Sequence, residues 1–201
     1  MRFSLFAAVL SLSVAGLAAH ADVITYSMSG DFSGSLGATN FTDTAGTFTF
    51  VSDTADIESV GFGIYLNEVG SGAVTIDGVG SATFLSSTFG VLGSVESAGF
   101  IDLNTGFAVG IFDPLLADYD LTAPFSDTAY FVDGMSGVAG PESTTLGDLI
   151  ITGGDFQNPT TTFTASASAA AVNGIVPEPS SFMLLGTGLL GVAGAVRRRL
   201  S

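Results

Sequence analysis

The stretch Thr47-Phe48-Thr49-Phe50 decides the fold class of this 201-residue chain. Threonine and phenylalanine alternate with a period of two, so an extended backbone places both rings on one side and both hydroxyls on the other. Such alternation is typical of a half-buried antiparallel strand, and both residue types favour strands. We therefore predict a strand here, with Phe48 and Phe50 buried in the core.

The same alternation recurs between positions 24 and 163 and predicts about ten short strands. Turn-forming pairs such as Asp77-Gly78 and Gly153-Gly154 separate them. The pattern predicts an all-β ectodomain, an antiparallel β-sandwich or jelly-roll-like fold. The helical turn expected within it covers 114–119, because Pro114 suits a first helical position. Besides Phe48 and Phe50, we predict that Phe62 and Ile64 are buried. The other apolar residues of the alternation are Ile24, Tyr26, Met28, Leu66, Val74, Ile76, Phe107, Val109, Ile111 and Phe163.

The N-terminus has the three parts of a secretory signal peptide. Met1 and Arg2 form a short basic region, residues 3–17 are apolar, and Ala19-His20-Ala21 is an Ala-x-Ala cleavage site. We predict a signal helix within residues 1–21, cleavage after Ala21 and a mature N-terminus at Asp22. The ectodomain then covers 22–167.

The C-terminus predicts a membrane segment after a flexible linker at 168–176. Residues 177–201 open with Pro177-Glu178-Pro179, continue with an uncharged apolar run at 182–196 and close with Arg197, Arg198 and Arg199. Such an arginine cluster stays on the cytoplasmic side of a membrane. We predict a single transmembrane helix. Its 15 apolar residues reach about 23 Å, short of a hydrocarbon core of about 30 Å, so the span is marginal.

This order of parts resembles the PEP-CTERM sorting signal of Gram-negative bacteria. The resemblance implies that Pro177, Glu178 and Pro179 form the sorting motif and that Arg197 to Arg199 form its basic end. It further implies a partner, an inner-membrane exosortase that recognises and processes the tail, and a transient stay in the inner membrane. The same tail is sometimes labelled an ice-binding protein C-terminal domain, which implies nothing about ice here. The alternative is an ordinary single-span anchor.

The charge of the ectodomain excludes several classes of function. All four Lys and Arg residues and the single His lie outside residues 22–176, which hold 18 of the 19 acidic residues because only Glu178 lies beyond them. Such a charge repels nucleic acid. Without His, Lys, Arg or Cys, the domain has no Ser-His triad, thiol nucleophile, Schiff-base lysine or zinc site. We expect a protein that is not an enzyme, with a carboxylate-pair hydrolase as a remote alternative.

Carboxylates leave calcium as the one cofactor to consider, because Ca²⁺ takes six to eight oxygen ligands. Asp118 and Asp120 are the first candidate ligands, and Asp53 and Asp56 are the second. The alternative is that these side chains are solvated carboxylates in turns.

The sequence and the resemblance together predict an exported cell-surface or extracellular-matrix protein. The family resemblance implies an association with exopolysaccharide. The alternative is a carbohydrate-binding or calcium-binding adhesive module. An exposed aromatic shelf would favour sugar binding, and two facing acids in a cleft would favour an enzyme.

Overall fold

Residues 22–133, 139–154 and 159–168 are the part of the chain that the computed structural model describes. Strands make up 71% of these residues and helical turns 4%, and the strand pairs are antiparallel, which confirms the all-β prediction. Thirteen strands replace the ten expected. They are β1 (Val23–Leu36), β2 (Thr39–Asp53), β3 (Glu58–Gly61), β4 (Ile64–Asn67), β5 (Gly70–Ile76), β6 (Gly80–Thr83), β7 (Phe89–Ser94), β8 (Ser97–Asp102), β9 (Phe107–Phe112), β10 (Phe125–Asp133), β11 (Ala139–Thr144), β12 (Gly147–Gly154) and β13 (Thr161–Ser168).

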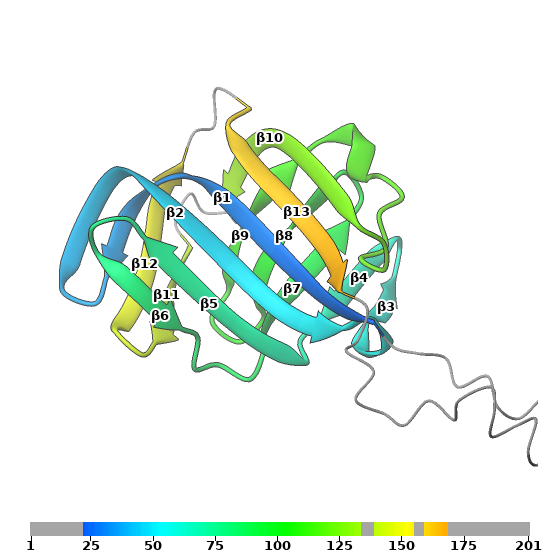
Figure 1. Cartoon of the computed structure of the whole chain (residues 1–201), viewed down its shortest axis with the longest axis horizontal. Coiled ribbons are helices and arrows are strands. Elements are labelled where there is room, and N and C mark those ends of the chain that lie inside the picture. The colour runs from blue at the N-terminus through cyan, green and yellow to red at the C-terminus, as the bar shows by residue number, and fades with distance from the viewer. Residues whose placement is uncertain (1–21, 134–138, 155–158, 169–201) are drawn as a thin grey trace, which may run out of the picture. The chain divides into compact units, whose positions relative to one another are not determined.

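The strands form two layers that share one strand. The first layer has the order β6-β5-β2-β1-β13-β10, and the second has the order β3-β4-β7-β8-β9-β10. The first half of β10 pairs with β13 over Phe125–Ala129, and its second half pairs with β9 over Tyr130–Asp133. In Figure 1 the strands β5, β2, β1 and β13 lie in front of β7, β8 and β9. Strand β10 therefore joins the two layers at one side.

Strands β11 and β12 extend the first layer from the second half of β1, beyond the part of β1 that pairs with β13. Strand β1 pairs with β13 over Val23–Ser29 and with β12 over Phe32–Leu36. Strand β11 pairs with β12, and its last residue, Thr144, makes a single bridge to Phe84 beyond β6. Strand β11 is consequently held by an interrupted ladder to β12, by the bridge to Phe84 and by a hydrogen bond from the amide of Leu85 to the carbonyl of Ser143 at 3.0 Å.

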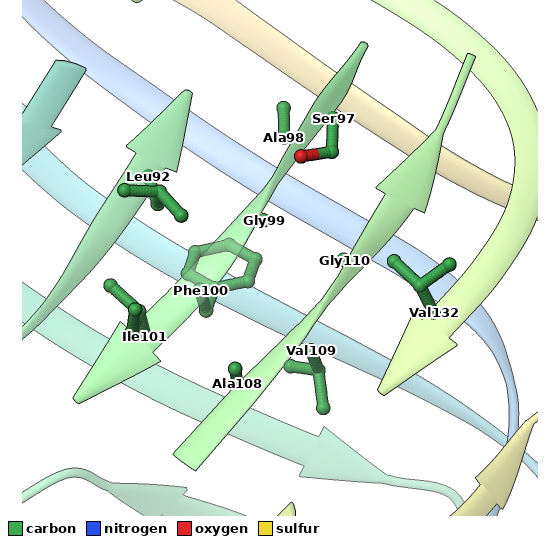
Figure 2. Close-up of a pocket in the computed structure, with 10 residues that line it drawn as sticks. All are labelled: Leu92, Ser97, Ala98, Gly99, Phe100, Ile101, Ala108, Val109, Gly110 and Val132. Atoms are coloured by element: carbon green, nitrogen blue, oxygen red, sulfur yellow. The ribbon is translucent and has the colours of Figure 1, made fainter. Parts of the chain in front are cut away.

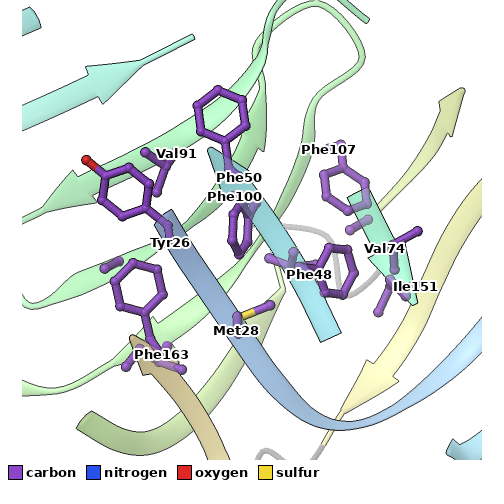
Figure 3. Packing of buried hydrophobic residues seen from close by; sticks show 14 of the residues in the cluster. Tyr26, Met28, Phe48, Phe50, Val74, Val91, Phe100, Phe107, Ile151 and Phe163 are labelled. Atoms are coloured by element: carbon purple, nitrogen blue, oxygen red, sulfur yellow. The ribbon is translucent and has the colours of Figure 1, made fainter. Parts of the chain in front are cut away.

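Aromatic rings fill the space between the layers (Figure 3). Phe48 of β2 stacks on Phe100 of β8 with ring centroids 5.9 Å apart, Phe50 meets Phe89 at 6.2 Å, and Phe163 meets Phe100 at 6.4 Å. Each pair joins one layer to the other, as in a sandwich. Phe48 and Phe50 are buried as predicted. Apolar residues of the alternation on other strands are buried too: Ile24, Tyr26, Met28, Val74, Ile76, Phe107, Val109, Ile111 and Phe163.

The prediction of a buried Phe62 is wrong. Its side chain is 97% exposed, in the turn between β3 and β4, with a backbone φ of 55°. The residue belongs to a left-handed turn between two glycines, so the alternation read across 62, 64 and 66 does not follow one strand. In the observed strand Tyr65 packs against the core cluster, Ile64 is half-buried, and Leu66 is buried outside that cluster.

The expected helical turn is present in shortened form as a 3-10 turn, η2 (Pro114–Leu116), and a second such turn, η1 (Thr54–Asp56), follows β2. No helix among the residues described is both long and apolar enough to cross a membrane. The predicted signal helix at 1–21 and the predicted transmembrane helix at 182–196 lie outside the described residues.

Candidate functional site

The outer face of the second layer carries an apolar groove of about 120 Å³ (Figure 2). Directly paired residues of neighbouring strands share a face, and Leu92, Gly99, Gly110 and Val132 form one such row across β7, β8, β9 and β10. The residues lining the groove include no charged side chain. The groove is thus an uncharged surface on a strongly acidic domain.

Two glycines keep the floor of this groove bare. Gly99 and Gly110 lie opposite each other on β8 and β9. A Cβ on Gly99 would lie 2.1 Å from the carbonyl oxygen of Val109, and one on Gly110 would lie 2.6 Å from that of Ala98. Neither position accepts a side chain without moving a backbone, because real atoms do not approach so closely. The groove follows from the close approach of the two strands.

An exposed aromatic pair lies on the same face as the groove. Phe112 of β9 and Tyr130 of β10 are directly opposite each other, and they are 44% and 47% exposed. Ser97 pairs with Phe112 on its other side, and the hydroxyls of Ser97 and Ser94 are hydrogen-bonded to each other. Aromatic surface beside a few hydroxyls is the composition of sites that bind small polar molecules with apolar faces. Phe112 and Tyr130 together form an exposed aromatic shelf, a feature that would favour sugar binding.

The sequence did not predict this surface, although its residues belong to strands that were predicted. The outward positions of β9 and β10 are occupied by Ala108, Gly110, Phe112, Tyr130 and Val132. The feature of the sequence that could have predicted this surface is the presence of large apolar residues on the solvent side of a strand. Their assembly into one surface depends on the register of four strands, which alternation along the chain does not fix.

In the first pair of predicted calcium ligands, one carboxylate accepts hydrogen bonds within its own turn. Asp120 accepts hydrogen bonds from the amide nitrogen and the hydroxyl of Thr122, at 3.0 and 2.7 Å. Asp118 is exposed. Asp113, upstream of both, accepts from the amide of Leu115 at 2.8 Å and caps η2.

The second pair has a similar role. Asp53 caps η1 by accepting from the amide of Ala55 at 2.8 Å, and Asp56 lies within that turn. Within residues 22–133, 139–154 and 159–168, no three His, Cys, Asp or Glu side chains are arranged to hold a metal ion. Neither predicted pair is therefore joined by a third carboxylate, and the hydrogen bonds fit the alternative of turn carboxylates.

The structure adds a pair of acids that the sequence did not single out. Asp102 at the end of β8 and Glu142 in β11 are both fully buried, and Thr105 donates a hydrogen bond to each of them. The two residues are 40 positions apart on strands that do not pair, so no local sequence pattern predicts their contact. This pair lies in the interior and not in an open cleft.

The sorting and cleavage residues lie mostly outside the described residues. This applies to Ala19 and Ala21 and to all six tail residues, Pro177, Glu178, Pro179, Arg197, Arg198 and Arg199. Asp22 is described: its backbone nitrogen donates to the hydroxyl of Thr54 at 3.2 Å, and its carbonyl accepts from the amide of Thr54 at 3.1 Å.

Comparison with known proteins bears on the tail. Residues 176–199 match the family model described as PEP-CTERM protein-sorting motif. The chain matches no curated protein and no solved structure. The matched range contains Pro177-Glu178-Pro179 and all three terminal arginines, so it confirms the resemblance that these residues carry. This chain accordingly bears, at residues 176–199, the PEP-CTERM protein-sorting motif of an exported protein that an exosortase sorts.

Proposed function

We propose that the chain is a non-enzymatic protein of the cell surface or extracellular matrix of a Gram-negative bacterium. A signal peptide exports it, the tail holds it in the inner membrane, and an exosortase removes the tail near Pro177-Glu178-Pro179. The match to the sorting motif is the observation that carries this proposal. An all-β ectodomain with an aromatic core and no cationic side chain suits a structural role better than catalysis.

Mass spectrometry of the envelope and medium fractions of an exosortase-bearing host tests the processing. The mature chain is expected to begin at Asp22 and to lack Arg197, Arg198 and Arg199. Replacing the three arginines by glutamates should block processing, because positive charge sets the orientation of the tail. Replacing them by lysines is the matched control and should preserve it. Intact arginines on the wild-type protein in every fraction would contradict the proposal.

A second function, binding of an uncharged polysaccharide, is favoured by the aromatic pair beside the groove. The apolar C–H face of a sugar ring packs on an aromatic face, and neighbouring hydroxyls and peptide groups supply hydrogen bonds. The domain's 18 carboxylates repel acidic glycans, whereas the charge-free groove leaves neutral ones unopposed. The matrix role and this binding role are compatible, since a bound polysaccharide would retain the protein in the matrix.

Affinity electrophoresis through gels that contain neutral or acidic polysaccharides tests this second function. Wild-type protein should be retarded by a neutral polymer and not by an acidic one. The double variant Phe112→Ala and Tyr130→Ala should migrate without retardation. Phe62→Ala removes a more exposed ring from the β3–β4 turn and should behave as wild type. Equal migration of all three proteins in every gel would exclude this function.

A further inference from the structure

The buried carboxyl groups of Asp102 and Glu142 each use one oxygen for protein hydrogen bonds. Oδ1 of Asp102 accepts from the hydroxyl of Thr88 at 2.8 Å, the amide of Asn104 at 2.7 Å and the amide of Thr105 at 3.3 Å. Oε2 of Glu142 accepts from the hydroxyl of Thr105 at 2.8 Å. Thr105 therefore holds both carboxyl groups, one through its backbone and one through its side chain.

The second oxygen of each group has no protein partner. Oδ2 of Asp102 and Oε1 of Glu142 are both buried, and no donor reaches either of them. Two ionised carboxylates have no proton to offer each other, so a fully ionised pair would leave two buried oxygens unpaired. Each unpaired buried group of this kind destabilises the folded state, and more so when it is charged. One proton placed between the two oxygens satisfies both at once.

No positive side chain is available to neutralise the pair. Residues 22–176 contain no Lys, Arg or His. Besides Asp102 and Glu142, the titratable group that acts on the pair is Asp148 of β12, which is exposed and accepts from the hydroxyl of Ser143 at 3.2 Å. Strand β9, beside β8, has no titratable side chain. Every charge that faces the pair is negative, and each of them favours uptake of a proton.

The surroundings of the two carboxyl groups determine which of them, Asp102 or Glu142, carries the shared proton. Burial raises the pKa of Glu142, the hydroxyl of Thr105 opposes this, and the negative charge of Asp102 raises the pKa further. Burial alone would also raise the pKa of Asp102, but the nearby Ser86 hydroxyl and the hydrogen bonds from Asn104, Thr88 and Thr105 outweigh it and hold that pKa below its usual value. The pattern is that of two acids in contact whose surroundings separate their roles.

We propose that Asp102 and Glu142 form an interior proton-binding site that fastens β11 to the turn between β8 and β9. Glu142 carries the proton on Oε1 and donates it to Oδ2 of Asp102, which stays ionised. When the pH rises and the proton leaves to water, two buried negative charges face each other. Strand β11 is then the element that yields, because apart from this site it is held by an interrupted ladder to β12, the bridge from Thr144 and one hydrogen bond from Leu85 to Ser143.

The substitution Glu142→Gln tests the proposal because the glutamine amide imitates the protonated acid. Its NH₂ donates to Asp102 and its carbonyl accepts from Thr105, at every pH. The full-length chain in non-ionic detergent is expected to lose melting temperature between pH 5 and pH 9, and the variant should lose much less. The gain at high pH should be about 3–5 °C for each pKa unit that separates the site from an ordinary glutamate. Glu58→Gln, the same change at an exposed position, is the control for removing one negative charge.

Carbon-13 NMR of labelled glutamate carboxyl groups gives a readout on the wild-type protein itself. One glutamate signal should titrate well above the others, and it should be the signal that Glu142→Gln removes or that Asp102→Asn shifts. A set of signals that all titrate together near the ordinary glutamate range would overturn the proposal. So would equal pH profiles for the Glu142 and Glu58 variants.

A metal ion in place of the proton is the competing occupant. It would stabilise the wild type at neutral pH in CaCl₂ more than in MgCl₂ of equal ionic strength, and it would not stabilise Glu142→Gln. That result would overturn the proton assignment. Coincident calcium and magnesium curves for the wild type support the proton.

Discussion

At the scale of single residues, the two phenylalanines Phe48 and Phe62 show how much context changes the value of one side chain. Phe48 is fully buried and contacts rings from both layers, including Phe32 at 5.4 Å and Phe100 at 5.9 Å. Phe62 is 97% exposed. The two residues have the same chemistry and lie in similar sequence patterns, but only one of them leaves water on folding.

We expect Phe48→Ala to lower the free energy of unfolding by about 3–5 kcal/mol, the usual cost of removing a buried aromatic ring. Phe62→Ala should change it by less than about 0.5 kcal/mol, since a surface substitution removes no packing. Urea unfolding followed by circular dichroism measures both. A small loss for Phe48→Ala would mean that the space between the layers is not closely packed.

At the scale of elements, the turn between β8 and β9 organises one end of the core. Asp102 closes this turn by accepting the amides of Asn104 and Thr105, and Gly106 donates to the carbonyl of Asp102 at 2.9 Å. The Thr105 hydroxyl then reaches Glu142 of β11. A tight turn and a distant strand are thereby joined through one side chain.

Thr105→Val keeps the shape of that side chain and removes its hydroxyl. We expect a loss of about 1–3 kcal/mol in the free energy of unfolding, because Oε2 of buried Glu142 and the amide of Phe107 both lose a partner. Thr128→Val is the matched control: its hydroxyl meets that of Thr162 at 2.8 Å on the exposed face, where water replaces it. Equal losses in the two variants would show that the Thr105 contact has no special weight.

The elements also show how far the sequence could lead. Alternation placed the core side chains of β1, β2, β5 and β9 correctly, because period two is a local property of an extended chain. It failed at Phe62, where a left-handed turn interrupts the period. It could not find the contact of Asp102 with Glu142 or the row from Leu92 to Val132, since both depend on which strands become neighbours. Two of the carboxylates predicted as calcium ligands, Asp53 and Asp120, accept hydrogen bonds from amides two residues further along the chain, which is a common role of aspartate in turns.

At the scale of the whole molecule, charge opposes folding. The 18 carboxylates of residues 22–176 have no internal cation, so ion pairing within this part of the chain is impossible. Their repulsion acts over the Debye length, which is about 30 Å at low salt and about 8 Å near 0.15 M. Dissolved salt is therefore the main source of screening for this domain.

We expect NaCl to raise the melting temperature by a few degrees between about 0.01 and 0.15 M, because the distant repulsions are screened over that range. The measurement is a melting series at fixed pH in NaCl, with MgCl₂ and CaCl₂ at matched ionic strength. A melting temperature that does not change with NaCl concentration would show that the carboxylates are too well solvated for their repulsion to affect stability. A calcium effect beyond that of magnesium that persists in Glu142→Gln would favour the carboxylates predicted as ligands, Asp118 and Asp120 first.

The position of β13 has a mechanical consequence. This strand is bonded on both sides, to β1 over Val23–Ser29 and to β10 over Phe125–Ala129, and it ends at Ser168, where the predicted linker begins. A pull transmitted along that linker would first reach residues 166–168, which pair with β1 alone, and then residues 162–165, where two ladders of hydrogen bonds share the load. An edge strand such as β3 or β6 in the same place would be peeled away along a single ladder. The ectodomain is thus attached to its tether through a strand that resists being stripped from the fold.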